Sequence, residues 1–399
     1  MITPVDLKDF GTSLNKEFRA SPSLLIRADA CPLRELIAGE HPSLPTIPWN
    51  IHGIVVHDLI QYPPEHGETL GDAYDSRLRK QIENARQSRA AGDRKSWLPD
   101  FCNTDGALYL DIRNFAARRE QGLALAARYQ THTSGGTAAI GTGDRDDQKL
   151  KLGIEVSIDD RETGIKGRID LLERGEQGLV IVDFKTGQLQ VDGAESPEVK
   201  PEYEKQLLIY AAMIFRNYNE WPVKWRLESQ SGQPIEKDIV HDDALKAFKE
   251  LVDLKHETDA KLKEQDFDWL ARGVKNGACR QCQWRHRCPV ARKKLATEGW
   301  VSFSTPSGKN SLVDIQGQII AVGTGNAAWL DVQLLNSAKV RVHRLRIAAQ
   351  FKDESPTPAV GDYVALFSAR ATIAEPTTDS TPKAPSRVEC DKTSYCLKL

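Results

Sequence analysis

The sequence of 399 residues has few cysteines, few methionines and no long apolar segment. Its seven cysteines are too sparse for a disulfide scaffold, which would be shorter and denser in cysteine. No stretch approaches the roughly 20 apolar residues of a membrane helix, so an integral helical membrane protein is excluded. The first 20 residues contain no apolar signal-peptide core. We therefore expect a cytoplasmic, reducing environment and no membrane partner.

Charge of either sign is also not in excess, since 54 lysines and arginines stand against 56 aspartates and glutamates. This balance excludes a uniformly basic coat for nucleic acid, although a local basic groove remains open. The Walker A pattern Gly-x-x-x-x-Gly-Lys-Ser/Thr does not occur, so we expect no P-loop motor within the chain. The length predicts two or three domains, because single cores rarely grow past about 250–300 residues.

Short apolar segments with β-branched residues predict a sheet in the middle of the chain, with helices around it. The expected strands are 152–158, 165–172, 179–185 and 223–228, and the expected helices are 52–62, 202–218 and 243–264. Antiparallel strands followed by a helix and a further strand indicate an α/β fold class for residues 1–298. A helical insertion is expected at about 65–148, where Ala, Arg, Glu, Gln and Leu are frequent.

A second region of short strands separated by turn residues begins near Trp300. Its expected strands are 313–322, 328–335, 339–347 and 363–371, with room for a fifth. This pattern predicts a small all-β barrel at 299–375, similar to an OB-fold. The Thr-, Ser- and Pro-rich residues 376–399 are expected to form a flexible tail.

Charged residues stand at the ends of two predicted strands. Asp170 ends one strand, and Asp183 and Lys185 close the next on a shared face, because strand side chains alternate. Such groups are costly to bury without a partner. Two carboxylates suit Mg²⁺ or Mn²⁺, which activates a bound water, and a lysine can stabilise charge on phosphate oxygens. The plainer alternative is an ordinary Asp–Lys pair at a strand end.

The order of these residues is typical of a known nuclease family. It resembles the RecB-like branch of the PD-(D/E)XK nuclease superfamily, in which a helical His precedes an Asp, an Asp/Glu-x-Lys motif and a Gln-x-x-x-Tyr helix. The matching segments are Gly53-Ile54-Val55-Val56-His57, Gly167-Arg168-Ile169-Asp170, Asp183-Phe184-Lys185 and Gln206-Leu207-Leu208-Ile209-Tyr210. The resemblance implies a restriction-endonuclease-like core with a helical insertion.

The same resemblance implies a role for each matching residue. The implied ligands of Mg²⁺ or Mn²⁺ are His57, Asp170, Asp183 and the main-chain carbonyl of Phe184. The implied catalytic set is Lys185, Asp183, Asp170, Glu155, Gln206 and Tyr210. In that set Glu155 is an acidic residue near the metal, and Gln206 and Tyr210 lie on the DNA side. Taken singly, His57 and Tyr210 also suit an ordinary core, and Glu155 suits a surface strand.

Four cysteines form a second constellation. Cys279, Cys282 and Cys288 lie within ten residues, and Cys31 lies far upstream. Four thiolates suit either Zn²⁺ or an iron–sulfur cluster, and ligand type alone does not separate the two. The spacing resembles the iron–sulfur subset of RecB-like nucleases, which includes AddB-type nucleases and CRISPR-adaptation exonucleases. That resemblance implies a structural [4Fe–4S] cluster joining the two ends of the domain. Zinc and plain reduced cysteines are the alternatives.

Basic and aromatic residues near these cysteines and in the barrel suit binding of single-stranded nucleic acid. The candidates are Trp284, Arg285, Arg287, Lys339 and Arg341. A solvated helix face is the alternative for the first group. Docking of a protein partner or of the first domain is the alternative for the barrel.

The leading hypothesis is a metal-dependent deoxyribonuclease. By resemblance it hydrolyses phosphodiester bonds of single-stranded DNA, from an end, in DNA repair, recombination or phage defence. A separate helicase or motor is the expected protein partner. The rival hypothesis is a catalytically silent single-stranded-DNA-binding or scaffolding module of a helicase–nuclease complex. Zinc-stapled RNA processing is a third option.

Overall fold

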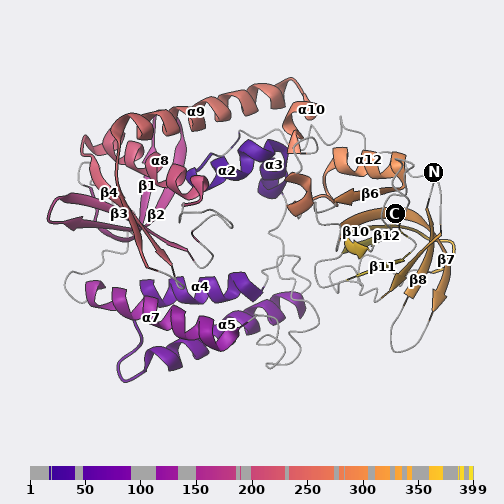
Figure 1. Ribbon diagram of the computed structural model, residues 1–399, viewed down its shortest axis with the longest axis horizontal. Coiled ribbons are helices and arrows are strands. Elements are labelled where there is room, and N and C mark those ends of the chain that lie inside the picture. The colour runs from indigo at the N-terminus through magenta and orange to yellow at the C-terminus, as the bar shows by residue number, and fades with distance from the viewer. Residues whose placement is uncertain are drawn as a thin grey trace.

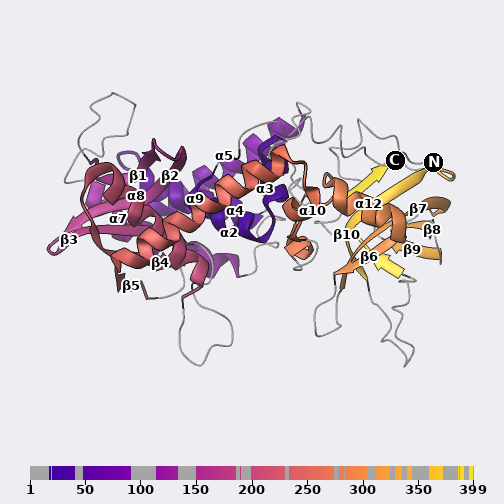
Figure 2. The ribbon, with the colours of Figure 1, turned by 90° about the horizontal axis from the view of Figure 1, so that it is seen from above.

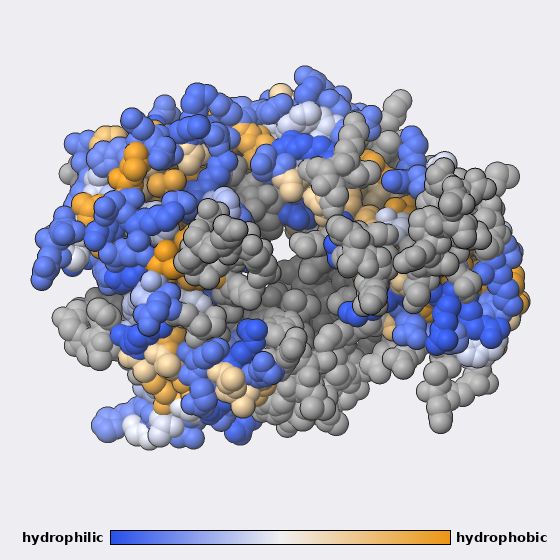
Figure 3. Space-filling model, viewed as in Figure 1, coloured by the Kyte–Doolittle hydropathy of each residue, from blue (hydrophilic) through white to orange (hydrophobic). Residues whose placement is uncertain are grey.

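The computed structural model consists of a mixed sheet with a layer of helices on each face, followed along the chain by a β-barrel (Figures 1 and 2). It describes residues 18, 20–40, 48–90, 114–133, 150–185, 189, 199–229, 233–273, 278–282, 284–303, 311–323, 329–334, 339–343, 359–371, 385, 387–390 and 395–398. No helix within these ranges has the length and apolar character to cross a membrane. On the face in Figure 3, hydrophobic residues are scattered among hydrophilic ones over the described elements.

A five-stranded sheet forms the centre of the first domain. Its strands, in spatial order, are β1 (Gly153–Asp160), β2 (Ile165–Gly175), β3 (Gly178–Lys185), β4 (Pro222–Ser229) and β5 (Ile235–Asp238). Only β3 and β4 run parallel, so the chain needs a crossover between them, which is a helix. β3 is buried along both faces, and its continuous apolar sequence reflects this position. The short strand β5 was not expected from the sequence.

Helices cover one face of the sheet, which packs on the larger apolar core. They are α2 (Pro22–Ala30), α3 (Pro32–Glu40), α8 (Pro201–Tyr218), α9 (His241–Lys263) and the short α10 (Phe267–Leu270). α8 is the crossover between β3 and β4, and α9 packs along it. Figure 1 shows α9 across the top of this layer and α8 between α9 and the sheet.

The opposite face is covered by α4 (Pro48–Gln61), α5 (Leu70–Ala90) and α7 (Phe115–Thr133). These helices form a second core with the outer side of β3, including Val182 and Phe184. In Figure 1 they lie side by side below the sheet. The helical insertion expected at 65–148 therefore contributes α5 and α7 to this layer, where they support α4.

The C-terminal part is a closed five-stranded barrel. The strands described in this part are β6 (Trp300–Phe303), β7 (Ser311–Gly323), β8 (Trp329–Leu334), β9 (Lys339–His343), β10 (Tyr363–Ala371), β11 (Arg387–Glu389) and β12 (Tyr395–Lys398), of which β7 to β11 form the ring. Neighbouring pairs run β7–β8–β9–β11–β10, and β10 pairs back to β7, which closes the ring. The pair β9–β11 is parallel. α12 (Pro289–Glu298) leads directly into β6.

The expected flexible tail at 376–399 was wrong for its described residues. β11 lies between β9 and β10, and Val388 is fully buried in the barrel core. β12 adds a further strand to β10. The barrel domain therefore extends past residue 375, to at least residue 398. A strand of three residues among Thr, Ser and Pro carries too little periodicity to be seen in the sequence.

Candidate active site

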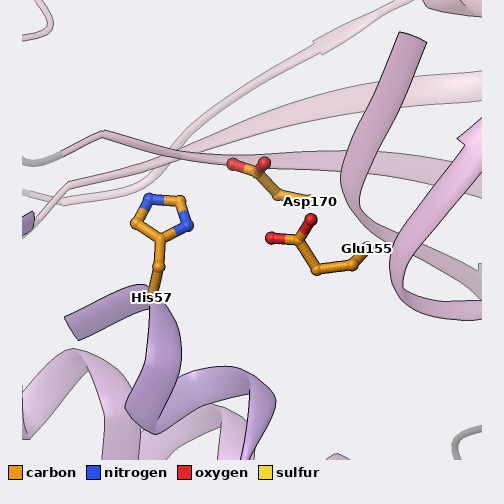
Figure 4. A group of neighbouring side chains, drawn as sticks. All are labelled: His57, Glu155 and Asp170. Carbon is orange, nitrogen blue, oxygen red and sulfur yellow. The ribbon is translucent and has the colours of Figure 1, made fainter. Parts of the chain in front are cut away.

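His57, Glu155 and Asp170 come together at one edge of the sheet. One ligand atom from each lies within 4.8 Å of the other two. His57 projects from α4 toward the carboxylates of β1 and β2 (Figure 4). Val55 and Val56 are fully buried, so the apolar face of α4 fixes where the half-buried His57 points. The His57 predicted from sequence therefore lies beside a carboxylate pair, and the ordinary-core alternative does not describe it.

The backbone of Glu155 is unusual. Its φ of 56° is left-handed, a conformation that costs a non-glycine residue about 1–3 kcal/mol. Its neighbours Ile154 and Val156 pair with Leu171 and Ile169, which places Glu155 opposite Asp170. Like charges directly opposite each other destabilise an antiparallel pair. Strain and repulsion thus meet at one point of the strand pair, the point where His57 also arrives.

Asp183, Lys185 and Gln206 form a bonded group beside these three residues. Nζ of Lys185 lies 3.1 Å from Oδ1 and 2.8 Å from Oδ2 of Asp183. Nε2 of Gln206 donates to Oδ1 of Asp183 at 3.3 Å, and Oε1 of Gln206 accepts from Nζ of Lys185 at 3.4 Å. Gln206 is buried on α8, so it positions the Asp183–Lys185 pair from the crossover helix.

Burial dominates the electrostatics of both aspartates. Burial raises the pKa of Asp183 to about 6, against the opposing effect of Lys185. Burial also raises the pKa of Asp170, with His57 and the amide of Phe184 acting the other way. Burial lowers the pKa of Lys185 but Asp183 raises it, and the net shift is upward. Lys185 therefore remains a cation. The pKa values of Asp170 and Asp183 stay raised because burial outweighs the positive groups near them.

Phe184 connects the two groups. Its amide N–H donates to Oδ2 of Asp170 at 2.8 Å. Its ring packs edge-on against His57, with centroids 6.0 Å apart, and against Tyr129 of α7 at 4.8 Å. The proposed metal contact of its carbonyl stays a prediction. The ring contacts show how the helical layer is tied to the end of β3.

The donor set fits a hard divalent cation. Oε2 of Glu155 and Oδ2 of Asp183 are buried and accept no hydrogen bond from the described residues. Each does face a cation, since Arg168 pairs with Glu155 and Lys185 pairs with Asp183. Buried carboxylate oxygens without hydrogen bonds need another positive partner. Carboxylates with one imidazole are ligands that Mg²⁺ or Mn²⁺ accepts.

Tyr210 has the packing role that the ordinary-core alternative predicted. It is buried, and its hydroxyl donates to the carbonyl of Arg168 at 2.8 Å. A Cβ at Gly167 would lie 2.5 Å from the Tyr210 ring, so only glycine leaves room for it. In the described structure, Tyr210 joins α8 to β2, and its predicted place on the DNA side of the site stays a prediction.

A family model described as the PD-(D/E)XK nuclease superfamily matches residues 19–289, more than half of the chain. The chain belongs to this superfamily. Its members are nucleases that use divalent metals. The five-stranded sheet with α4 and α8 is the PD-(D/E)XK domain of this chain.

Two solved structures align with this PD-(D/E)XK chain at low similarity. One is a candidate exonuclease from Eubacterium rectale, with 12% identity, a TM-score of 0.34, and coverage of 66% of this chain and 85% of that chain. The other is SSO0001, with 14% identity, a TM-score of 0.23, and coverage of 60% and 95%. Likeness at these TM-scores says nothing about function. The search of curated proteins found no match.

The four predicted cysteines converge at the other end of the PD-(D/E)XK domain. Cys31 precedes α3, Cys279 lies in the short helix η2 (Ala278–Gln281), and Cys288 caps α12. Cys282 and Cys31 each affect the pKa of Cys279, which burial raises to about 12. Burial likewise raises the pKa of Cys288 to about 12, with the other three thiols contributing. The four thiols are thus near one another.

Close backbone contact holds Cys31 in place. A Cβ at Gly273 would lie 2.7 Å from the Cβ of Cys31, so glycine alone lets the segment after α10 approach. Sγ of Cys31 also faces the carbonyl of Leu270 at 3.7 Å. Among the residues that the structure describes, no three of these sulfurs lie within 4.8 Å of one another.

The candidate DNA-binding residues differ in how exposed they are. Arg285 and Trp284 are buried, so the structure offers neither as a DNA contact. Arg287 is exposed, and its predicted contact with DNA stays a prediction. The exposed Lys339 and Arg341 both pair with one buried carboxylate, Asp331 on β8. Their charge is therefore partly neutralised, a contact that the sequence of β9 alone does not indicate.

Proposed function

We propose that this chain is a divalent-metal-dependent deoxyribonuclease that acts on single-stranded DNA. The observation that carries the proposal is the meeting of His57, Glu155 and Asp170 within 4.8 Å, beside the Asp183–Lys185 pair. Among the residues that the structure describes, three carboxylates and one imidazole face two cations, Arg168 and Lys185, so this site is short of positive charge. A metal-bearing phosphodiester site has this composition.

The residues of the site have different roles in the proposed hydrolysis. His57, Glu155, Asp170 and Asp183 would hold Mg²⁺ or Mn²⁺, which supplies Lewis-acid stabilisation of the phosphate and a more acidic bound water. Lys185, held by Asp183 and Gln206, donates to a phosphate oxygen or orients the attacking water. Arg168 is exposed beside Glu155, where its guanidinium can take a neighbouring phosphate of the strand.

The barrel supports the preference for a single strand. Counting the ring strands β7, β8, β9, β10 and β11 from one to five, their spatial order is 1-2-3-5-4-1. This order and the parallel pair of the third and fifth strands are what we expect of an OB-like barrel. Such barrels commonly bind single-stranded nucleic acid. A separate helicase would supply that strand, in repair, recombination or defence.

The four cysteines are proposed to hold a [4Fe–4S] cluster. In a tetrahedral zinc site, Zn–S bonds of about 2.3 Å place the sulfurs about 3.8 Å apart. In the described structure no three of these sulfurs lie within 4.8 Å of one another, so they are not gathered as closely as a zinc site needs, which favours the larger cluster over zinc. The cluster is structural in this proposal, since it joins residue 31 to residues 279–288 across the whole domain.

The test compares labelled single-stranded DNA, duplex DNA and single-stranded RNA as substrates, with Mg²⁺ or Mn²⁺. We expect the wild type to cut single-stranded DNA, and Lys185→Ala to lose about 10²–10³-fold in rate. Lys200→Ala is a matched control. Lys185 and Lys200 both lie over the ring of Tyr203, at 5.0 and 5.6 Å, but only Lys185 faces Asp183.

Each result has a defined meaning. Equal loss in Lys185→Ala and Lys200→Ala would show that the assay reports charge near Tyr203 and not the active site. A wild type that binds single-stranded DNA but cuts no substrate with either metal would overturn the nuclease proposal in favour of a silent binding module. Preferential cutting of RNA would show that the substrate is RNA and would overturn the proposed preference for DNA.

A further inference from the structure

A buried arginine joins the cysteine segment, residues 278–282 and 284–288, to the barrel. Arg285 is 2% exposed and lies between Cys282 and Cys288 in sequence. Its Nη1 donates to the carbonyls of Cys279 at 2.7 Å, Cys282 at 2.8 Å and Arg280 at 3.2 Å. One guanidinium nitrogen thus organises the main chain around two of the proposed ligands.

The other two nitrogens of Arg285 bind the barrel. Nε donates to Oδ2 of Asp314 at 2.7 Å, and Nη2 donates to Oδ1 of Asp314 at 3.0 Å. Nη2 also donates to Oγ of Ser368 at 2.6 Å. The guanidinium lies 4.5 Å from the ring centroid of Phe303 on β6. Every nitrogen of Arg285 therefore has an acceptor, divided between the cysteine segment and the barrel.

The barrel is shaped to receive this arginine. Asp314 on β7 is 3% exposed, and its Oδ1 also accepts from the amide of Ser368 at 2.8 Å. Ser368 has a left-handed φ of 58° and lies at the register shift of β10 between Leu366 and Ala369. This bulge turns the amide N–H of Ser368, a donor, and its hydroxyl oxygen, an acceptor, toward the Arg285–Asp314 pair. A non-glycine residue in that conformation is strained, and the bonds to Asp314 and Arg285 offset the strain.

Two further contacts make the junction rigid. His286 stacks on Trp284 and meets Phe367 of β10 edge-on, with centroids 6.2 and 6.3 Å away. At the end of α12, the carbonyl of Gly299 accepts from the amide of Gln316 on β7 at 2.8 Å. In Figure 2, α12 and β6 lie on the side of the barrel that faces α10. The cysteine segment is thus clamped between the two domains.

We propose that the barrel is a structural part of the four-cysteine site, with Asp314 and Ser368 holding Arg285 as a positioning residue for the cysteine segment. Undocking of the barrel would release Arg285, loosen the carbonyls around Cys279 and Cys282, and weaken retention of the metal. This inference rests on the proposed cysteine-bound metal, and it is independent of the proposed nuclease activity. It assigns the barrel a role besides contact with nucleic acid.

The test uses two matched isosteric changes in the full-length protein. Asp314→Asn removes the charge that holds Arg285. Asp331→Asn removes a second buried barrel carboxylate, on β8, that is paired with Arg341 and not with the cysteine segment. Both proteins are purified without oxygen, and their iron, sulfide and zinc contents are measured. Loss of the visible cluster absorbance is then followed in air.

We expect Asp314→Asn to lose its metal about tenfold faster than the wild type, and Asp331→Asn to match the wild type. Ser368→Ala, which keeps the charge pair, should fall between them. If Asp314→Asn does not yield folded protein, Ser368→Ala against Asp331→Asn decides the question.

The failures are distinguishable. A wild type that retains neither iron nor zinc overturns the cysteine metal site and this inference with it. A loaded wild type with equal retention in Asp314→Asn and Asp331→Asn overturns the role of the barrel alone. Equal acceleration in both variants also overturns it, since that result reports general loosening of the barrel. Cleavage of DNA by the wild type is unaffected by either conclusion.

Discussion

Two buried polar clusters in this molecule differ in how well their charges are matched. Around Arg285, every nitrogen has an acceptor, and Asp314 accepts from both domains. At the sheet edge, buried oxygens of Glu155 and Asp183 accept no hydrogen bond from the described residues, and burial raises the pKa of Asp183. Both clusters contain carboxylates and a strained non-glycine backbone. Only the first is complete without a ligand.

The difference separates a structural cluster from a functional one. A satisfied network stabilises one conformation, whereas an unsatisfied one is costly in the free protein and is retained for what it binds. Removal of a charge should therefore have opposite effects on stability in the two places. The following experiments test this contrast, from the largest expected effect to the smallest.

The largest effect is expected for Asp170→Asn. Cleavage should fall by about 100-fold or more, because the bound metal supplies several kcal/mol of transition-state stabilisation. The asparagine keeps an oxygen for the amide of Phe184 but lacks the charge that burial disfavours. The metal-free variant should therefore melt at a higher temperature than the metal-free wild type at neutral pH. Calorimetry in chelator checks the direction, and a lower midpoint would contradict it.

The stability difference between Asp170→Asn and the wild type should also depend on pH. Because burial raises the pKa of Asp170, its protonated form favours the folded state, and that contribution is lost as pH rises through the raised value. The stability difference between Asp170→Asn and wild type should consequently shrink toward acidic pH. A difference that is constant from pH 4 to pH 8 would show that the substitution acts through packing.

The second effect concerns the satisfied cluster. Asp314→Ala leaves Arg285 buried and unpaired, which should cost about 3–5 kcal/mol of stability. Arg285→Ala leaves the carboxylate unpaired in the same way. The double variant should cost clearly less than the sum of the two, because it leaves neither charge behind. Additive losses in denaturant unfolding would mean that the two side chains do not depend on each other.

The smallest effect is expected at Asp331. Bonds from Arg341 hold the pKa of this carboxyl down at about 2, with Lys339 adding to the effect. A lowered pKa gives stability that is present above the ordinary value near 3.9 and is lost as pH falls toward 2. Asp331→Asn should lower the stability of the barrel modestly at neutral pH, and its difference from the wild type should shrink below pH 4, which flattens the acid limb of the unfolding profile. An unchanged acid limb would be the contrary result.

The central sheet could be predicted because the residue types of its strands indicate which positions are buried. The unbroken apolar segment of β3 requires burial on both faces, and Asp183 and Lys185 at its end require partners. The resemblance to RecB-like nucleases then indicated Asp170, His57 and Glu155 from their order. Their meeting depends on long-range packing of α4, and the left-handed backbone of Glu155 has no local sequence signal.

Other features had no signal in the sequence. Arg285 stands among basic residues and was interpreted as a DNA contact, but its partner Asp314 lies 29 residues away on another domain. The short β11 gains its strand conformation from β9 and β10 alone. Both cases depend on tertiary contacts that override local composition, and so did the packing of Tyr210 against Gly167.

The closure of the barrel has a consequence for synthesis of the chain. β11 fills the gap between β9 and β10, so the ring cannot close until residues 387–389 have left the ribosome. The cysteine segment is made about 100 residues earlier, within the typical span of a domain. During this interval the barrel that carries Asp314 and Ser368, the partners of Arg285, is not yet closed. The residues that close the ring are therefore made well after the cysteines whose segment the barrel holds.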